Sequence, residues 1–148
     1  MYAIDGKISE NSAHFFHSMY ENFPWLEVSM RVQDVVGVKI VTRDCCGSRL
    51  KNLEIRAGMT RVPDSLAPSK GRLTVNSMVG KFKGPVQPLR SYQICFHKKV
   101  HAKYITLQIA GTSILEMNEV VPILPGDDLC HNLAGGEINI YYCQAQLA

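Results

Sequence analysis

The sequence predicts an α+β fold, in which a twisted antiparallel β-sheet is covered by one or two helices and joined by long basic loops. Short stretches of alternating apolar and polar residues recur along the chain, as in strands with one buried face. Residues 13–23 instead carry apolar side chains at helical spacing. With 148 residues, of which 46% are hydrophobic, the chain can form the core of a single domain over residues 1–148.

The first third of the chain is expected to combine a strand, a helix and one ambiguous segment. Residues 2–8 alternate as in an opening strand, and residues 9–12 offer N-cap side chains for the helix that follows. Pro24 should end that helix. Residues 25–35 fit either a strand or a helix, whereas the β-branched residues of 35–42 favour a strand.

The remaining elements are expected to be short strands separated by turns and basic loops. Residues 44–48 are typical of a turn, and the stretch from Gly58 to Gly71 is long enough to suggest a functional loop. A second basic loop is expected at residues 80–85, and residues 97–103 are expected to form a basic hairpin connection. The predicted strands lie at residues 53–58, 73–79, 92–96, 105–109 and 138–142.

Positive charge is concentrated in the middle of the chain. Residues 39–103 hold fourteen Lys and Arg against three acids, a net of +11, while residues 1–38 carry −3 and residues 104–148 carry −5, which sum to +3. A solvated face normally mixes the two signs, so a basic stretch of this length predicts an anionic partner.

The five cysteines indicate a reducing compartment. Their number is odd, Cys45 and Cys46 are adjacent, and no Asn-x-Ser/Thr acceptor is present, so a secreted disulfide framework is not expected. No apolar run has the length of an export or membrane-spanning segment.

The motif search predicts a protein that is not an enzyme. The chain has no Gly-rich phosphate loop, Gly-x-Ser-x-Gly elbow or His-Glu-x-x-His sequence. His14 and His17 could share a metal face on the predicted helix, but nearby ligands are lacking, and Cys45-Cys46 lacks the usual zinc spacing. No catalytic residue, metal site or cofactor is therefore expected.

The candidate site is instead an anion-binding surface made of cations and apolar loop residues. Near an anionic membrane each Lys or Arg contributes about 1 kcal/mol, and a fully buried Leu or Phe adds about 1.5–3 kcal/mol. The predicted membrane- or anion-binding residues are Arg61, Val62, Leu66, Lys70, Arg72, Lys81, Phe82, Lys83, Lys98, Lys99 and Lys103. The acidic tail of one copy could dock on the basic middle of the next, which predicts self-association through Glu116, Glu119, Asp127, Asp128 and Leu66.

An alternative partner for the same cations is RNA. Lys and Arg side chains contact nucleic-acid phosphates, and Phe82, Tyr92 and Phe96 could stack on bases. Tyr92 and Phe96 alternate in phase with Ile94, however, which favours a place in the core.

Four stretches of the chain resemble the globular core of rhabdovirus matrix proteins, as in a plant-infecting member. They are the opening residues 2–8, the aromatic stretch 13–23, the loop 62–70 and the closing residues 136–140. The resemblance implies a structural virion protein that self-associates weakly and links the viral nucleocapsid and its RNA to the anionic inner face of the envelope. It also implies a location in the virion, the host cytoplasm or nucleus, and the membrane periphery.

Overall fold

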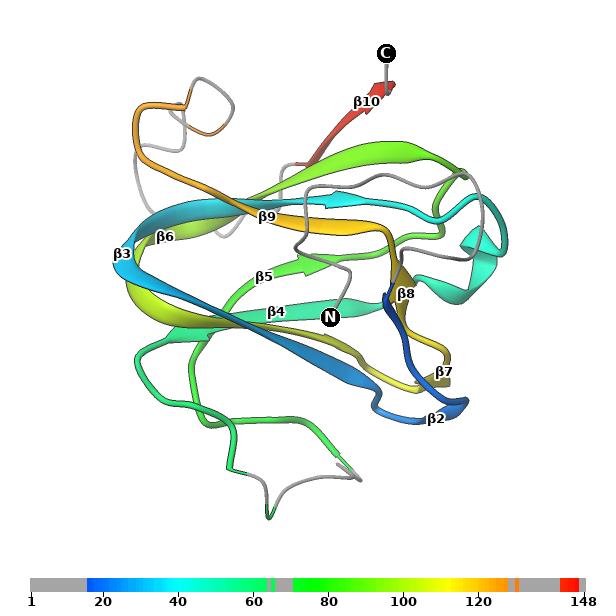
Figure 1. Ribbon diagram of the computed structural model, residues 1–148, viewed down its shortest axis with the longest axis horizontal. Helices are drawn as coiled ribbons and strands as arrows, with labels where there is room; N and C mark the ends of the chain where they lie inside the picture. Colours follow the sequence, from blue (N-terminus) through cyan, green and yellow to red (C-terminus); the bar gives the residue numbers. More distant parts are fainter. Residues whose placement is uncertain (1–15, 64, 66–70, 128–129, 131–141, 147–148) are drawn as a thin grey trace.

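A computed structural model describes residues 16–63, 65, 71–127, 130 and 142–146 of the chain. These residues form a sandwich of two antiparallel β-sheets organised around two long strands, β3 (Trp25–Val41) and β6 (Arg90–Ile109) (Figure 1). Both strands are rich in β-branched and aromatic residues, which favour extended backbone.

The two long strands belong to both sheets because they bend together. Their pairing runs from Trp25↔Gln108 to Ser29↔Tyr104, is interrupted by two register shifts, and resumes from Gly37↔Cys95 to Val41↔Ser91. Register shifts bend a strand pair and increase its twist, and Figure 1 shows the pair folding over at one edge of the molecule. One antiparallel pair thereby connects the two layers of the sandwich.

Each half of the β3–β6 pair is extended by further strands. The first sheet continues from the second half of β6 to β4 (Leu53–Gly58) and then to β5 (Met78–Phe82). The second sheet places β9 (Glu119–Ile123) beside β3 and β10 (Tyr142–Gln146) beside β6. All of these pairs are antiparallel.

The core lies between the sheets and is formed by the inward side chains of both. It includes Val38, Ile40, Ile55, Ile94 and Leu107, each with no measurable exposure. At about 25 cal/mol per Å² of buried apolar surface, side chains of this kind contribute most of the favourable free energy of folding.

Short strands at one end of the sandwich hold the loops in place. Strand β1 (Phe16–His17) pairs with β8 (Glu116–Met117), and β2 (Glu21–Asn22) pairs with β7 (Thr112–Ser113). A 3-10 turn, η1 (Gly47–Arg49), lies at the same end (Figure 1). This end carries the candidate site.

The α+β prediction is wrong, because the described residues contain strands and one 3-10 turn but no α-helix. The described part of the predicted helix at 13–23 holds β1 and β2, and Phe16 packs on the core from there. Its aromatic spacing therefore reflects two short strands and not a helical face. No helix among the residues described has the length and apolar character needed to cross a membrane.

Several strand predictions are confirmed and several loop predictions are wrong. Residues 53–58 form β4 as expected, and the ambiguous segment 25–35 is strand. The predicted basic hairpin at 97–103 is wrong, because β6 passes through it while paired with β3. Likewise the predicted basic loop at 80–85 starts within β5, and residues 73–75 are not strand.

The prediction of reduced cysteines is also wrong. Cys45 and Cys46 form a disulfide between adjacent residues, and Cys95 in β6 forms a second one with Cys130, with Cα atoms 5.6 Å apart. The second disulfide packs with Ile123 and Val36. An odd number of cysteines therefore did not exclude paired ones.

Candidate functional site

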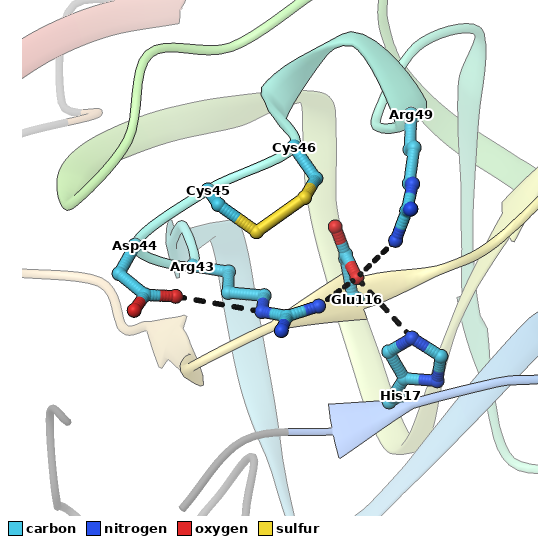
Figure 2. Close-up of a disulfide and its surroundings, with 7 residues drawn as sticks. All are labelled: His17, Arg43, Asp44, Cys45, Cys46, Arg49 and Glu116. Carbon is cyan, nitrogen blue, oxygen red and sulfur yellow. Dashed lines mark hydrogen bonds and ion pairs between the residues drawn. A yellow bond between two sulfur atoms is a disulfide. The ribbon is translucent and has the colours of Figure 1, made fainter. Parts of the chain in front are cut away.

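Three basic side chains converge on one buried carboxylate at the β1–β8 end of the sandwich. Nη1 of Arg43 donates to Oε2 of Glu116 at 2.8 Å. Nη1 of Arg49 and Nε2 of His17 lie 3.4 and 3.5 Å from the same oxygen. Figure 2 shows all three groups directed at this carboxylate, with the Cys45–Cys46 disulfide beside them. We call this site the triad site after its three basic side chains, His17, Arg43 and Arg49; it also includes Glu116 and the disulfide.

Strand pairing and a tight turn bring the triad site together. His17 and Glu116 are direct partners in the β1–β8 pair, so their side chains share one face. The two arginines flank the disulfide in the sequence, Arg49 as the last residue of η1, and Cys46 between them adopts a left-handed backbone with φ of 66°. A Cβ at Gly47 would overlap the carbonyl oxygen of Val86, so only glycine fits there.

Further hydrogen bonds fix the backbone beside these residues. The Ser113 hydroxyl donates to the carbonyl of Arg49 at 2.9 Å, and Ser18 N–H donates to the carbonyl of Leu115 at 2.9 Å. The Thr42 hydroxyl, one residue before Arg43, donates to the carbonyl of Gln87 at 2.6 Å. The triad site is therefore pre-organised by the sheet ends and not by long side chains alone.

Glu116 acts as the electrostatic centre of the site. Its side chain is 2% exposed, and a buried carboxylate is tolerated only when cations or donors compensate its charge. Arg43 is 17% exposed, whereas Arg49 and His17 are each 39% exposed. The carboxylate thus holds the three basic groups in position while parts of Arg49 and His17 face solvent.

The charges of the triad site are close to balanced. The positive charges of the two arginines are matched by two carboxylates. One is Glu116, and the other is Asp44, whose Oδ1 lies 3.4 Å from Nε of Arg43. A balanced cluster does not attract anions strongly, but it still presents many N–H donors in a fixed geometry. The adjacent disulfide adds an apolar, polarisable surface.

Such a combination suits a neutral ligand with several hydroxyl groups and an apolar side. Hydroxyl oxygens accept hydrogen bonds from guanidinium and imidazole N–H groups, while C–H groups pack on sulfur. No group of three or more His, Cys, Asp or Glu that could hold a metal ion occurs in the described part of the chain.

The structure brings four of the predicted anion-binding residues, Arg72, Lys81, Phe82 and Lys83, to one cleft, and the other described members of the set do not line it. Val62 and Phe82 are 3% and 2% exposed, so the prediction that they anchor loops on a surface is wrong. Arg61, Arg72 and Lys99 each lie within 4 Å of a carboxylate, at 3.9, 3.0 and 3.9 Å. Lys81 and Lys83 are exposed at the end of β5, Lys98 and Lys103 are exposed on β6, and Leu66 and Lys70 lie outside the described residues.

Two of the predicted self-association acids are buried. Glu116 and Glu119 are 3% and 6% exposed, so the prediction that they contact a second copy is wrong. Glu116 lies in β8, which pairs with β1, and Glu119 is the first residue of β9, which pairs with β3. Asp127 is exposed and accepts the N–H of Leu124 at 3.1 Å, whereas Asp128 lies outside the described residues.

Sequence reasoning did not identify the triad site. The sequence suggested a metal role for His17 together with His14, which lies outside the described residues, and nearby ligands for it were lacking; the two arginines contributed only to the positive charge of the middle of the chain. The available signal was the stretch from Arg43 to Arg49, in which two arginines flank adjacent cysteines and a glycine. The contribution of Glu116, 73 residues from Arg43, had no local signal.

Comparison with solved structures shows that the fold is that of fucose-binding lectin domains. The chain superposes on a fucolectin from striped bass serum with a TM-score of 0.66 and 26% identity, covering 82% of this chain and 40% of that one. It superposes on the lectin domain of lectinolysin in complex with Lewis B antigen with a TM-score of 0.63 and 18% identity, covering 83% and 82%. A fucose-binding module of Streptococcus pneumoniae gives a TM-score of 0.59 and 24% identity, covering 82% and 79%.

The sequence itself gives no further assignment. No protein-family model matches the chain, and no characterised protein matches it by sequence. The chain spans about two fifths of the length of the striped bass lectin.

These structural neighbours overturn the function predicted from the sequence. The matrix role, the RNA-binding alternative, and the membrane and nucleocapsid partners are wrong, because the similar structures are modules that bind fucose or a Lewis antigen. The basic middle of the chain misled the prediction, since several of its cations serve ion pairs within the sheets. The resemblance to rhabdovirus matrix proteins stays a prediction of the sequence.

Proposed function

We propose that the chain is a non-catalytic carbohydrate-binding module that binds fucose, or glycans that carry fucose, at the triad site. The observation that carries the proposal is the convergence of His17, Arg43 and Arg49 on buried Glu116 beside a disulfide between adjacent cysteines. The fold shared with fucose-binding modules supports the same ligand class.

Each part of the triad site has a role in this proposal. Arg49 and His17, partly exposed, donate hydrogen bonds to sugar hydroxyls, and Arg43 supplies a third donor group closer to the core. The disulfide packs against the C–H face of the ring or the deoxy carbon of fucose. Glu116 does not contact the sugar but keeps the donors pre-organised, which lowers the entropic cost of binding.

The absence of catalysis is part of the proposal. Glycosidases generally use two carboxyl groups about 5–10 Å apart that face one open site. At the triad site one carboxylate, Glu116, is buried and engaged by cations, and the other, Asp44, lies against Arg43. Neither is placed to protonate a glycosidic oxygen while the other attacks the sugar.

The two disulfides support an oxidising environment for the module. Disulfides persist in extracellular and periplasmic compartments and are rare in a reducing cytosol. Cys45–Cys46 forms part of the proposed sugar contact, so a reducing compartment would change the binding surface as well as the stability.

Titration calorimetry with L-fucose tests the proposal. We expect binding of L-fucose, weaker binding of L-galactose, which has one more hydroxyl, and no heat with unrelated sugars. Arg49→Gln should weaken fucose binding about 10- to 100-fold, because it removes charge-assisted hydrogen bonds worth about 1.5–3 kcal/mol.

The matched control is Arg31→Gln, which removes the same charge from an exposed position of β3. This variant should bind fucose as the unmodified protein does. Lack of fucose binding by the unmodified protein, or equal loss in both variants, would refute the proposed function.

A further inference from the structure

A second concave site lies at the β4–β5 edge of the sandwich, outside the triad site. It is a cleft of about 540 Å³, and its lining includes Asn52, Glu54, Arg72, Lys81 and Lys83. Small-molecule sites in proteins typically enclose about 300–1,000 Å³. The cleft is therefore large enough for one or two sugar rings, and nothing in the proposed fucose site uses it.

Strand register places the charged groups of the cleft on the outer face of the sheet. Glu54 is the direct partner of Lys81 on β5 and of Gln108 on β6, so the three side chains share one face. The opposite face holds Leu53 and Ile55, which are buried in the core.

The segment at residues 71–73 forms a wall of the cleft. Nε of Arg72 donates to both carboxylate oxygens of Glu54, at 3.1 and 3.0 Å. Leu73 N–H donates to the side-chain oxygen of Gln108 at 2.9 Å, and the amide nitrogen of Gln108 donates to the carbonyl of Gly71 at 3.1 Å. These bonds fix the segment over the sheet, so the cleft is preformed.

The cleft has an excess of positive charge. Among the described residues that line it, Glu54 is the one acid, and Arg56 and Arg72 already engage that carboxylate at 3.2 and 3.0 Å. Within the part of the chain described, no carboxylate lies within 4 Å of the amino group of Lys81 or Lys83. The lining thus has three cations against one anion, a net of +2.

One short backbone segment contributes residues to both the cleft and the triad site. Asn52 N–H donates to the carbonyl of Lys83 at 2.9 Å, and Ala110 N–H donates to the carbonyl of Asn52 at 2.9 Å. Three residues earlier, the carbonyl of Arg49 accepts the Ser113 hydroxyl at 2.9 Å. The segment 49–52 therefore borders both sites, on the same end of the sandwich.

We propose that this cleft is a second ligand site that binds an anionic saccharide through a carboxylate or sulfate ester group. Lys81 and Lys83 contact the anion, and Arg72, held by Glu54, adds further N–H donors. The anionic character follows from the cleft alone, whereas the choice of a saccharide rests on the proposed function.

Titration calorimetry on the intact chain tests this site with a sulfated galactose, N-acetylneuraminic acid, neutral galactose and sodium sulfate. We expect both acidic sugars to bind more tightly than galactose and than sulfate alone. The double variant Lys81→Gln, Lys83→Gln should weaken binding of the acidic sugars about tenfold or more, because two charge-assisted contacts are lost.

The matched control is the double variant Lys98→Gln, Lys103→Gln, which removes two exposed charges from the bend of β6. It should change the affinity for acidic sugars less than about twofold, since neither lysine lines the cleft and solvent and salt screen exposed charges. Arg49→Gln should leave binding of acidic sugars intact while it weakens fucose binding about 10- to 100-fold.

Four results would overturn the second site. They are acidic sugars that bind no better than galactose, equal losses in the two lysine pairs, loss of acidic-sugar binding in Arg49→Gln, and sulfate that binds as tightly as the sugars. If the protein bound acidic sugars but not fucose, the proposed function would be refuted, whereas the proposal of a second site in this cleft would still be supported.

Discussion

The triad site and the β4–β5 cleft both place arginines around one buried glutamate, but they differ in what remains uncompensated. In the triad site, Arg43 and Arg49 are balanced by Glu116 and Asp44. In the cleft, Glu54 is already engaged by Arg56 and Arg72, and the described lining, with Arg72, Lys81 and Lys83 against Glu54, keeps a net charge of +2. The number of cations in a region therefore does not decide what it binds; the charge left after ion pairing does.

A second difference lies in the apolar surface. The triad site has a disulfide at its edge, which can pack against C–H groups of a sugar. The described lining of the cleft has no disulfide; its apolar part comes from Leu53, Phe82 and Ala110, and its charged groups stand on the outer face of a sheet. The first arrangement suits a neutral ligand with one apolar side, and the second suits a charged one.

The largest expected effect comes from removing the buried carboxylates one at a time. Glu116→Gln should lower the free energy of unfolding by about 2–3 kcal/mol, because Arg43 and Arg49 lose their counter-charge. The value is below that of a fully buried pair, because Arg49 is 39% exposed. Fucose binding should fall at least about tenfold, since the donors are no longer held in place. Urea unfolding and calorimetry measure the two effects.

Glu54→Gln is the reciprocal variant. It should destabilise the fold to a similar extent, because Arg56 is almost as buried as Glu54, at 9% and 7% side-chain exposure. Fucose affinity should remain unchanged, because Glu54 lies in the lining of the cleft and not in the triad site. If Glu54→Gln removed fucose binding as Glu116→Gln does, the two regions would not be separate sites.

A smaller effect is expected from the disulfide that distinguishes the triad site. Cys45→Ser with Cys46→Ser should lower fucose affinity about fivefold, through loss of apolar contact and of the fixed turn. The free energy of unfolding should change little, because a cross-link between neighbours closes almost no loop. Acidic-sugar binding serves as the control and should be unaffected. Unchanged fucose affinity would mean that the disulfide shapes the turn without touching the ligand.

The sequence predicted the strands that are locally determined and missed those that depend on a distant partner. Residues 53–58 alternate and are confirmed as β4. Residues 97–103 are polar and basic, as hairpin loops often are, yet they remain in β6 because β3 pairs alongside through the bend. The position of a bend is set by register shifts between two strands, and one strand's sequence does not contain that information.

The candidate site was missed for a related reason. The sequence gives the number of charged residues in each segment, but it does not show which of them form ion pairs in the fold. Arg43 and Glu116, for example, form an ion pair although they are 73 residues apart. The acids expected to dock on another copy instead compensate cations within the molecule. Only the local part of the triad site, Arg43 to Arg49 with its adjacent cysteines, could have been recognised from the sequence.

The smallest expected effect is also the most direct test of the contrast between a balanced and an unbalanced cluster. When the salt concentration rises from about 0.05 to 0.5 M, the Debye length falls from roughly 14 to 4 Å. The affinity of the cleft for a sulfated galactose should then fall several-fold, because Lys81 and Lys83 act through net charge. The affinity of the triad site for fucose should change less than about twofold, because a neutral sugar is bound by directed hydrogen bonds that salt screens only weakly. If calorimetry showed that salt weakens the affinities for both ligands to the same extent, the two sites would not differ in the net charge that acts on their ligands.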